Sequence, residues 1–379
     1  MTAFRDGQVT LRELRRTEGF TNAIQEIGYQ GIRVGDLVVH GMDGFAGAIG
    51  VSDSDGKSSP VVHAYRANEK ADARYFAYVL RTLAVNGYVS TLAKGIRERS
   101  TAFDASTLAN VLLPVPPLDA QRRIADFLDA ETARIDRMMS ARRSQMALLD
   151  ERLDSIRDQL FGSPSSDSVP TPLMYLTDPY RPIVYGIVQA GPEVPDGVPY
   201  IKTGDLKRLH PHSLSRTSPE IHAQYRRAAV QPGDIVMAMR ASIGAVAVVP
   251  PELHEANLTQ GTARIAPARG VSGQWLLQAL QTQRVREQCD LRAVGSTFRT
   301  LNIWDLRRIN VNAVSAEKQN VVTKQFSVHA VRHALIQGAT QRQVSLLTER
   351  RQALITAAVT GQFDVSTASG RNVTDGVTA

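Results

Sequence analysis

The sequence contains one pattern twice, at a displacement of 198 positions. The segment VGDLVVHGMDGFAGAIGVSD begins at position 34, and the similar segment PGDIVMAMRASIGAVAVVPP begins at position 232. The same displacement separates Gln121 from Gln319, and LLDER at position 148 from LLTER at position 346. Because separated markers share one displacement, we predict that the chain consists of two copies of one structural unit.

Each copy combines strand and helix patterns. In both segments a Gly-Asp pair opens an alternating apolar run, and a glycine-containing turn leads into a second run, which predicts two antiparallel strands. Amphipathic helices are expected from Ala73 and from Gly273. Short helical pieces at 104–110 and 302–308, each followed by a short closing strand, should end the two copies. Each copy is therefore predicted to be a mixed α/β domain.

A long polar helix with a narrow apolar stripe is predicted after each domain. Apolar side chains recur at alternating spacings of three and four residues, which is typical of a coiled-coil seam that needs one partner helix. The seam positions are Leu128, Ile135, Met139, Met146, Leu149, Leu153, Ile156 and Leu160 in the first helix, and Val344, Leu347 and Leu354 in the second. We expect the two helices to form an antiparallel coiled coil with each other, roughly 60 Å long at about 1.5 Å per residue. Self-association of two chains through the first helix is the competing interpretation.

These patterns divide the chain into six segments. The Ser, Pro and Gly residues of GSPSSDSVPTP indicate a linker between the copies, and the polar C-terminus is predicted to be disordered. The predicted segments are a first domain at 1–116, a first helix at 117–162, a linker at 163–172, a second domain at 173–316, a second helix at 317–361 and a disordered tail at 362–379.

Charge and composition limit the class of protein. The chain has a formal net charge of +7 and a pI of about 9.6, which favours a polyanionic partner. The second copy is the more basic, since residues 170–314 hold 16 basic and 11 acidic side chains. A single cysteine, Cys289, excludes an internal disulfide and a cysteine-rich metal site. Without a long apolar stretch or a secretory signal, we expect a cytoplasmic protein with no membrane partner.

The junction between the first domain and the first helix resembles a known family. The segment LPVPPLDAQRRIADFLDAETARIDRMM, from position 113, is similar to the junction found in specificity subunits of type I restriction-modification enzymes. In that family, prolines end a target-recognition domain and Gln-Arg-Arg-Ile opens a conserved helix. The segments YIKTGDLK at 200, QPGDIVMAMRASIGAVAVV at 231 and GSTFRTLNIWDLRRI at 295 also resemble family segments, in the family's order. The resemblance covers nearly the whole chain.

The resemblance implies both an architecture and a function. Two target-recognition domains in tandem, separated by the coiled coil, would each recognise one half of a bipartite sequence in double-stranded DNA. The helices would fix the spacer and dock two methyltransferase subunits, and restriction subunits would complete the complex. The chain itself would catalyse nothing and bind no cofactor, with S-adenosylmethionine, ATP and Mg²⁺ held by the partner subunits.

Two features depart from the family's pattern. The second junction, NVNAVSAEKQNVVTKQF, lacks the prolines and the Gln-Arg-Arg-Ile sequence, which weakens the expectation that a partner docks at the second helix. The first copy has no counterpart of the segment that precedes Tyr200 in the second. We therefore expect an N-terminally incomplete first domain with an open sheet edge.

DNA contacts are predicted on loops between rigid elements, where Arg, Lys, Ser, Thr and Asn can reach bases or phosphates. The candidates are Lys202, Thr203, Lys207, Arg208, Arg240, Ser242, Arg299, Thr300 and Asn302 in the second copy, and Arg97, Arg99 and Ser100 in the first. The segment 295–302 is favoured because a similar set of Gly, Ser and Arg residues recurs at 95–100. Ordinary solvated loops have the same composition, so about half of the set is expected to have no role in binding.

Two other functions fit parts of the pattern. The chain could be a duplicated coiled-coil protein that binds DNA without methyltransferase partners. It could instead be an adenine methyltransferase, but TDPYRP at 177–182 lacks one proline of the Asp-Pro-Pro-Tyr motif that holds a flipped base. FAGAIG at 45–50 also departs from the Phe-x-Gly-x-Gly cofactor loop and is expected to be a turn.

Overall fold

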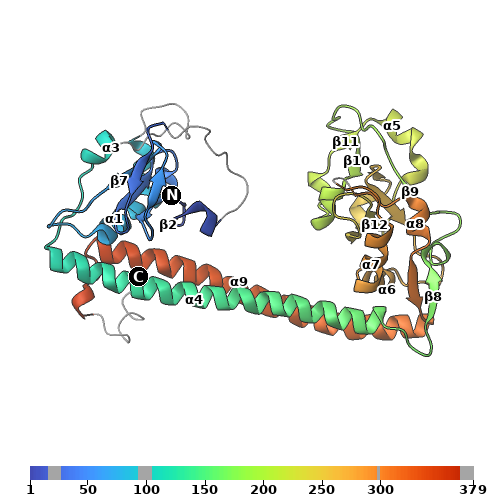
Figure 1. Ribbon diagram of the computed structural model, residues 1–379. Coiled ribbons are helices and arrows are strands. Elements are labelled where there is room, and N and C mark those ends of the chain that lie inside the picture. Colours follow the sequence, from blue (N-terminus) through green and yellow to red (C-terminus); the bar gives the residue numbers. More distant parts are fainter. Residues whose placement is uncertain (16–26, 93–104, 297–298, 368–379) are drawn as a thin grey trace. The chain divides into compact units, whose positions relative to one another are not determined.

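The computed structural model describes residues 1–15, 27–92, 105–296 and 299–367, which form two compact units (Figure 1). Unit 1 comprises Met1–Arg143 and Thr340–Ala379, and unit 2 comprises Ser144–Ala339. The two long helices, α4 at Leu118–Arg157 and α9 at Ala316–Val359, contribute a section to each unit. Each unit therefore holds one globular domain together with a paired section of both helices.

The globular part of unit 1 is a set of small antiparallel sheets covered by α1 (Ala73–Val85). The main sheet has the order β5-β4-β7, and its apolar face packs on α1 through Leu37, Ile49 and Leu80. The strands are β1 (Thr2–Ala3), β2 (Val9–Thr10), β3 (Gln30–Ile32), β4 (Leu37–His40), β5 (Ile49–Val51), β6 (Gly56–Ser58) and β7 (Val62–Tyr65). The short helices are η1 (Arg12–Leu14), η2 (Gly44–Ala46), α2 (Tyr88–Thr91), α3 (Ala105–Ala109) and η10 (Val365–Thr367).

The globular part of unit 2 has a four-stranded sheet of order β13-β12-β15-β9, a three-stranded sheet of order β11-β10-β14, and the pair β16-β8. The strands are β8 (Val169–Pro172), β9 (Val184–Tyr185), β10 (Val198–Ile201), β11 (Arg216–Thr217), β12 (Ile235–Ala238), β13 (Val246–Val248), β14 (Asn257–Leu258), β15 (Thr262–Ile265) and β16 (Asn310–Ala313). The helices are α5 (Pro219–Gln224), α6 (Gly273–Leu280), α7 (Gln283–Arg292) and α8 (Ile303–Arg307), with the shorter turns η4 (Asp158–Gly162), η5 (Leu173–Tyr175), η6 (Thr203–Lys207), η7 (Pro211–Ser213), η8 (Arg226–Ala228) and η9 (Pro251–Leu253). Trp275 and Leu276 of α6 are fully buried against one face of the four-stranded sheet.

The repeated Gly-Asp pair shapes the turn before the central strand of each copy. Gly233 has a φ of +87°, a conformation that glycine adopts without a Cβ clash. The buried carboxylate of Asp234 accepts a hydrogen bond from the Gln231 backbone N–H at 2.7 Å. Asp36 makes the equivalent bond to the Arg33 N–H at 2.9 Å. The predicted hairpins follow as β4–β5 and β12–β13, so this part of the sequence prediction is confirmed.

A buried glutamine joins α4 to the domain of unit 1. The side-chain oxygen of Gln121 accepts a hydrogen bond from the Asp72 backbone N–H at 2.9 Å, at the residue that caps α1. Its side-chain amide donates to the carbonyls of Lys70 at 3.0 Å and Pro116 at 2.8 Å. Gln121 is completely buried, so these bonds satisfy its polar atoms and fix the start of α4 on the start of α1.

The second repeat marker, Gln319, does the same in unit 2. Its side-chain oxygen accepts from the Ser272 backbone N–H at 2.8 Å, and its amide donates to the Val314 carbonyl at 2.9 Å. Ser272 caps α6, as Asp72 caps α1. The repeated glutamine is therefore a structural joint between each domain and its long helix.

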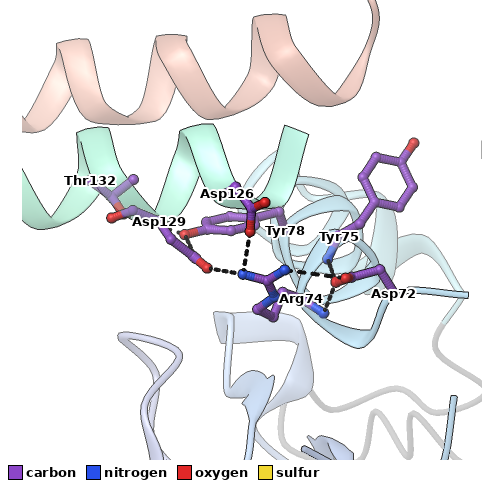
Figure 2. A network of polar contacts seen from close by, with 7 residues as sticks. All are labelled: Asp72, Arg74, Tyr75, Tyr78, Asp126, Asp129 and Thr132. Atoms are coloured by element: carbon purple, nitrogen blue, oxygen red, sulfur yellow. Dashed lines mark hydrogen bonds and ion pairs between the residues drawn. The ribbon is translucent and has the colours of Figure 1, made fainter. Parts of the chain in front are cut away.

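In unit 1 a polar network strengthens this joint (Figure 2). The Arg74 guanidinium lies between Asp126 and Asp129 of α4, at 2.8 and 2.9 Å, and also contacts Asp72 at 3.3 Å. The Tyr78 hydroxyl donates to Asp129 at 2.8 Å, and burial raises the pKa of Tyr78 to about 12, so the hydroxyl remains protonated as a donor. Such charge-assisted bonds fix the orientation of α1 on α4.

The long helices run antiparallel in both units, which confirms the predicted antiparallel coiled coil. In unit 1, Asp136 contacts Arg351 at 3.2 Å, and three residues further along α4 the Thr348 hydroxyl donates to the Met139 sulfur at 3.4 Å. In unit 2, Asp150 accepts from Gln337 at 3.1 Å, and the rings of Phe161 and Phe326 pack edge to face at 5.5 Å. Of the predicted seam positions, the buried ones are Leu128, Ile135, Met139, Val344 and Leu354, and the partly buried ones are Met146, Leu149, Leu153, Ile156, Leu160 and Leu347.

The closing strand predicted for each copy forms only in the second. β16 pairs with β8, which lies inside the segment 163–172 that we expected to be a linker, so the linker prediction is wrong for 169–172. In the first copy, residues 112–116 belong to no strand, and Leu112 and Val115 are 94% and 66% exposed.

Two further boundaries differ from the prediction. The helix expected from Gly273 is broken into α6 and α7, because the hydroxyl of buried Thr282 bonds to the Ala279 carbonyl and a new helix begins after it. The first residues of the predicted disordered tail are packed, since the ring of Phe363 lies 5.5 Å from that of Phe127 on α4. Burial of an aromatic ring overrides the polar composition around it.

Replacing Gln121 with Ala should loosen unit 1 at the joint. The change leaves the Asp72 N–H and two carbonyls without their partners, which costs about 1–3 kcal/mol for a buried group. Hydrogen–deuterium exchange over residues 70–80 should accelerate strongly. The control Gln341→Ala changes an exposed residue of α9 in the same unit and should leave this exchange unchanged. Equal protection in both variants would contradict a clamp at Gln121.

Candidate nucleic-acid interface

Unit 2 brings the predicted contact loops together at the end of β12. Arg240 follows the strand, and Thr300 forms an antiparallel bridge with it. The Leu301 N–H donates to the Met239 carbonyl at 2.9 Å, which holds the segment around Thr300 beside the strand end. Two predicted segments that lie sixty residues apart in sequence are therefore neighbours.

The third predicted loop, η6, is tied to the same place. The Thr203 hydroxyl donates to the Gly261 carbonyl at 3.1 Å, and the same carbonyl accepts from the Met239 N–H at 2.8 Å. Leu206 of η6 is buried, while Lys207 beside it is exposed. We call the segments 202–208, 239–245 and 299–302 the loop cluster.

The loop after β12 has a strained backbone. Ala241 has a φ of +58°, a region that costs a residue with a Cβ about 1–2 kcal/mol. Its neighbours Arg240 and Ser242 are both exposed. Strain of this kind persists only where the surrounding structure enforces it, and it is frequent at binding sites.

A cavity of about 410 Å³ opens in the loop cluster. Its lining includes Lys207 of η6, Ser242 of the strained loop and Arg286 of α7. Arg286 is 43% exposed and lies 3.6 Å from Asp154. The predicted contact set does not include Arg286, because that set was restricted to loops. The cluster of basic residues at 284–292 is the sequence signal that points to Arg286.

Several predicted contact residues have structural partners. The Asn302 side chain accepts from the Asp305 N–H at 2.9 Å and caps α8. The Lys202 ammonium donates to the Ser215 hydroxyl at 2.8 Å. Arg299 lies 3.1 Å from the Asp290 carboxylate, which offsets its charge. These contacts orient the loops, and they leave the three side chains with fewer free donors and acceptors for a ligand.

The remaining cations of the loop cluster are unpaired. Within the described part of the chain, Lys207, Arg208 and Arg240 are exposed and form no ion pair. A basic surface without acidic partners binds phosphates by releasing their counterions. Arg240 also presents a planar fork that suits bidentate contact with a guanine edge.

The first copy has a different surface at the corresponding strand end. The counterpart of Arg240, displaced by 198 positions, is Met42, which is 50% exposed. Arg5 nearby is paired with Asp43 at 2.8 Å. The predicted contacts Arg97, Arg99 and Ser100 lie outside the described residues.

Other kinds of site are not supported by the side chains present. Among the described residues, no group of three or more His, Cys, Asp or Glu side chains is placed to hold a metal ion. Burial raises the pKa of Cys289 to about 12, so its thiol is protonated and unreactive at neutral pH. In the same part of the chain, no helix has the length and apolar character that crossing a bilayer requires.

Comparison with known proteins finds a similar specificity subunit and similar solved structures. No family model matches it. The Type I restriction enzyme EcoBI specificity subunit of Escherichia coli is 27% identical over 316 residues, which cover 76% of this chain. The match spans 65% of that relative, less than two thirds of its length. Over most of its own length the chain is therefore similar to a specificity subunit of a type I restriction enzyme.

Solved structures agree with the family fold. A chain from a study of complex assembly and conformational transition in the type I R-M system superposes with a TM-score of 0.71 at 21% identity, over 88% of this chain and 84% of that one. The HsdS subunit of Thermoanaerobacter tengcongensis gives a TM-score of 0.51 at 20% identity, over 88% and 82%. These likenesses confirm the predicted fold class, mixed α/β domains combined with long paired helices.

Proposed function

We propose that the chain is the DNA-specificity subunit of a type I restriction-modification complex and that it catalyses no reaction itself. The observation that carries the proposal is the loop cluster of unit 2, where Lys207, Arg208 and Arg240 are exposed and form no ion pair among the described residues. Similarity to a type I restriction enzyme specificity subunit supports DNA as the polyanion that this surface binds. The repeated domain supports a bipartite target, with one half recognised by each copy.

The surface of α9 supports docking of a methyltransferase subunit. Four apolar side chains on its unit 2 section are 50–69% exposed, and three of them are spaced by seven residues so that they share one face. This α9 stripe consists of Val321, Val328, Val331 and Leu335. Exposed apolar side chains aligned on one helix face are typical of a protein interface.

The division of labour in the complex follows from this proposal. Two methyltransferase subunits would hold S-adenosylmethionine, and restriction subunits would use ATP and Mg²⁺. This chain would supply the sequence preference and the scaffold. A duplicated protein that binds DNA without partners remains the competing function, and the α9 stripe disfavours it because the stripe would then be left exposed to water.

Arg240→Ala should weaken binding of the target duplex about 10–100-fold, because a bidentate contact to a base is worth about 1–3 kcal/mol. Fluorescence anisotropy at fixed salt, with the chain bound to its methyltransferase partner, would measure the change. The control Arg284→Ala removes an exposed arginine of α7 that does not line the cavity of the loop cluster. Arg299→Ala should have a smaller effect than Arg240→Ala because Asp290 already engages Arg299. Equal affinities for the Arg240 and Arg284 variants would contradict the assignment of this surface.

Leu335→Lys should reduce association with the methyltransferase subunit at least about tenfold, because a desolvated charge replaces an apolar contact. Leu335 is 69% exposed, so the change should leave the fold intact. Co-purification and size-exclusion chromatography of the co-expressed pair would show the loss. Gln341→Lys adds the same charge at an exposed position of the same helix and should co-elute normally. Normal co-elution of the Leu335 variant would remove the α9 stripe from the interface.

A further inference from the structure

A second group of arginines lines a cavity at the start of β12, whereas the loop cluster lies at its end. The cavity has a volume of about 310 Å³ and lies between the segment after η5, the turn η8 and strand β15. The charged and aromatic side chains that line it are Tyr180, Arg181, Arg226, Arg227, Glu255 and Arg264. These residues come from four separated parts of unit 2, and none belongs to the set predicted to contact DNA.

Arg264 is the fixed element of this cavity. Its residue is 4% exposed, and its backbone is held in the centre of the sheet by pairing with Val236 and Val184. The guanidinium donates to the carbonyls of Arg227 at 2.7 Å and Ala229 at 2.8 Å. In the described part of the chain its Nε–H has no acceptor. A buried cationic donor without an acceptor is costly, and an anion in the cavity would supply one.

The neighbouring ion pair leaves the cavity with a surplus of positive charge. Arg181 makes a two-pronged contact with the buried carboxylate of Asp234, at 2.5 and 2.9 Å, so these two charges offset each other. Arg226 and Arg227 are exposed and form no ion pair within the described residues. Apart from this pair, the charged residues of the lining are three arginines, at 226, 227 and 264, and one acid, Glu255.

Burial and the neighbouring Arg181 disfavour the charged form of Arg264. Burial, followed by the positive charge of Arg181, lowers the pKa of Arg264, while Asp234 and Asp178 raise it. An anion beside the guanidinium would favour its charged form. Glu255 has a φ of +60°, so the rim of the cavity also contains a strained residue.

We propose that this cavity binds a phosphate group carried by a nucleotide, either free or within a DNA strand. Guanidinium groups match phosphate oxygens through parallel N–H···O bonds, and the surplus positive charge fits an anion with two or more acceptor oxygens. Tyr180 at the rim is 94% exposed and offers an aromatic face on which a base can stack. The proposal does not depend on the loop cluster, which lies at the other end of β12.

Isothermal titration of the full chain tests the proposal with inorganic phosphate and with deoxyadenosine 5′-monophosphate. We expect the double variant Arg226→Gln, Arg227→Gln to bind both at least about tenfold more weakly than the unmodified chain. The control Arg284→Gln, Arg332→Gln removes the same charge from exposed helical positions outside the cavity and should bind normally. Glu255→Gln should bind about threefold more tightly, because it removes the carboxylate that repels phosphate.

A second arm identifies the source of the phosphate. If the site holds a strand phosphate, the Arg226, Arg227 variant should also lose affinity for a duplex of generic sequence, and the slope of log affinity against log salt should fall by about 1. If it holds a free nucleotide, duplex binding should be unchanged while mononucleotide binding is lost. Absence of phosphate and nucleotide binding by the unmodified chain, or equal binding by the two double variants, would overturn the proposal. Loss of duplex binding in Arg240→Ala with normal phosphate binding would leave this site intact and separate it from the loop cluster.

Discussion

The architecture depends on a buried glutamine that joins each globular domain to a long helix. Gln121 and Gln319 each accept from the backbone N–H of a helix-capping residue and donate to a carbonyl at the end of the preceding domain. The proposed function requires a rigid joint, because a domain that recognises DNA can hold a fixed register on it only if the domain cannot pivot on its scaffold. Conformational freedom at this point would have to be removed on binding, at a cost in affinity.

The two copies have diverged around this common joint. Arg74, two residues after the α1 cap, bridges Asp126 and Asp129. In the second copy the residue two positions after the α6 cap is Gln274, and the positions 198 residues after the two aspartates hold Lys324 and Ser327. The counterparts of the α9 stripe on α4 are Arg123, Ala130, Ala133 and Arg137, so at these four positions the large apolar side chains belong to the second helix alone. The second junction, which resembles the family least, thus carries the more apolar surface. Divergence of this kind is expected if the two copies recognise different half-sites and make unequal partner contacts.

The sequence predicted those features that depend on local pattern. The Gly-Asp turns, the hairpins after them and the antiparallel helices follow from turn chemistry and from the spacing of apolar residues. The closing strand of the first copy was wrongly predicted, because a strand needs a partner that the pattern of 112–116 does not show. The sequence does not predict the arginine cavity either. Arg181, Arg226 and Arg264 are far apart in the sequence, and only strand pairing and turns bring them together. Asn302 and Arg299 are residue types that often contact DNA. Their bonds to Asp305 and Asp290 depend on the three-dimensional structure and do not follow from the sequence.

The proposed function requires that two copies of one domain recognise two separate DNA half-sites. It is tested most directly by sequencing the methylome of a methylation-free host that expresses this chain with its methyltransferase subunit. We expect methylation in a motif of two short sequences separated by a fixed number of unspecified bases. Exchanging residues 173–316 for the second domain of another family member should change one half of the motif and preserve the other half and the spacer. A single uninterrupted motif, or a change in both halves after the exchange, would contradict the account.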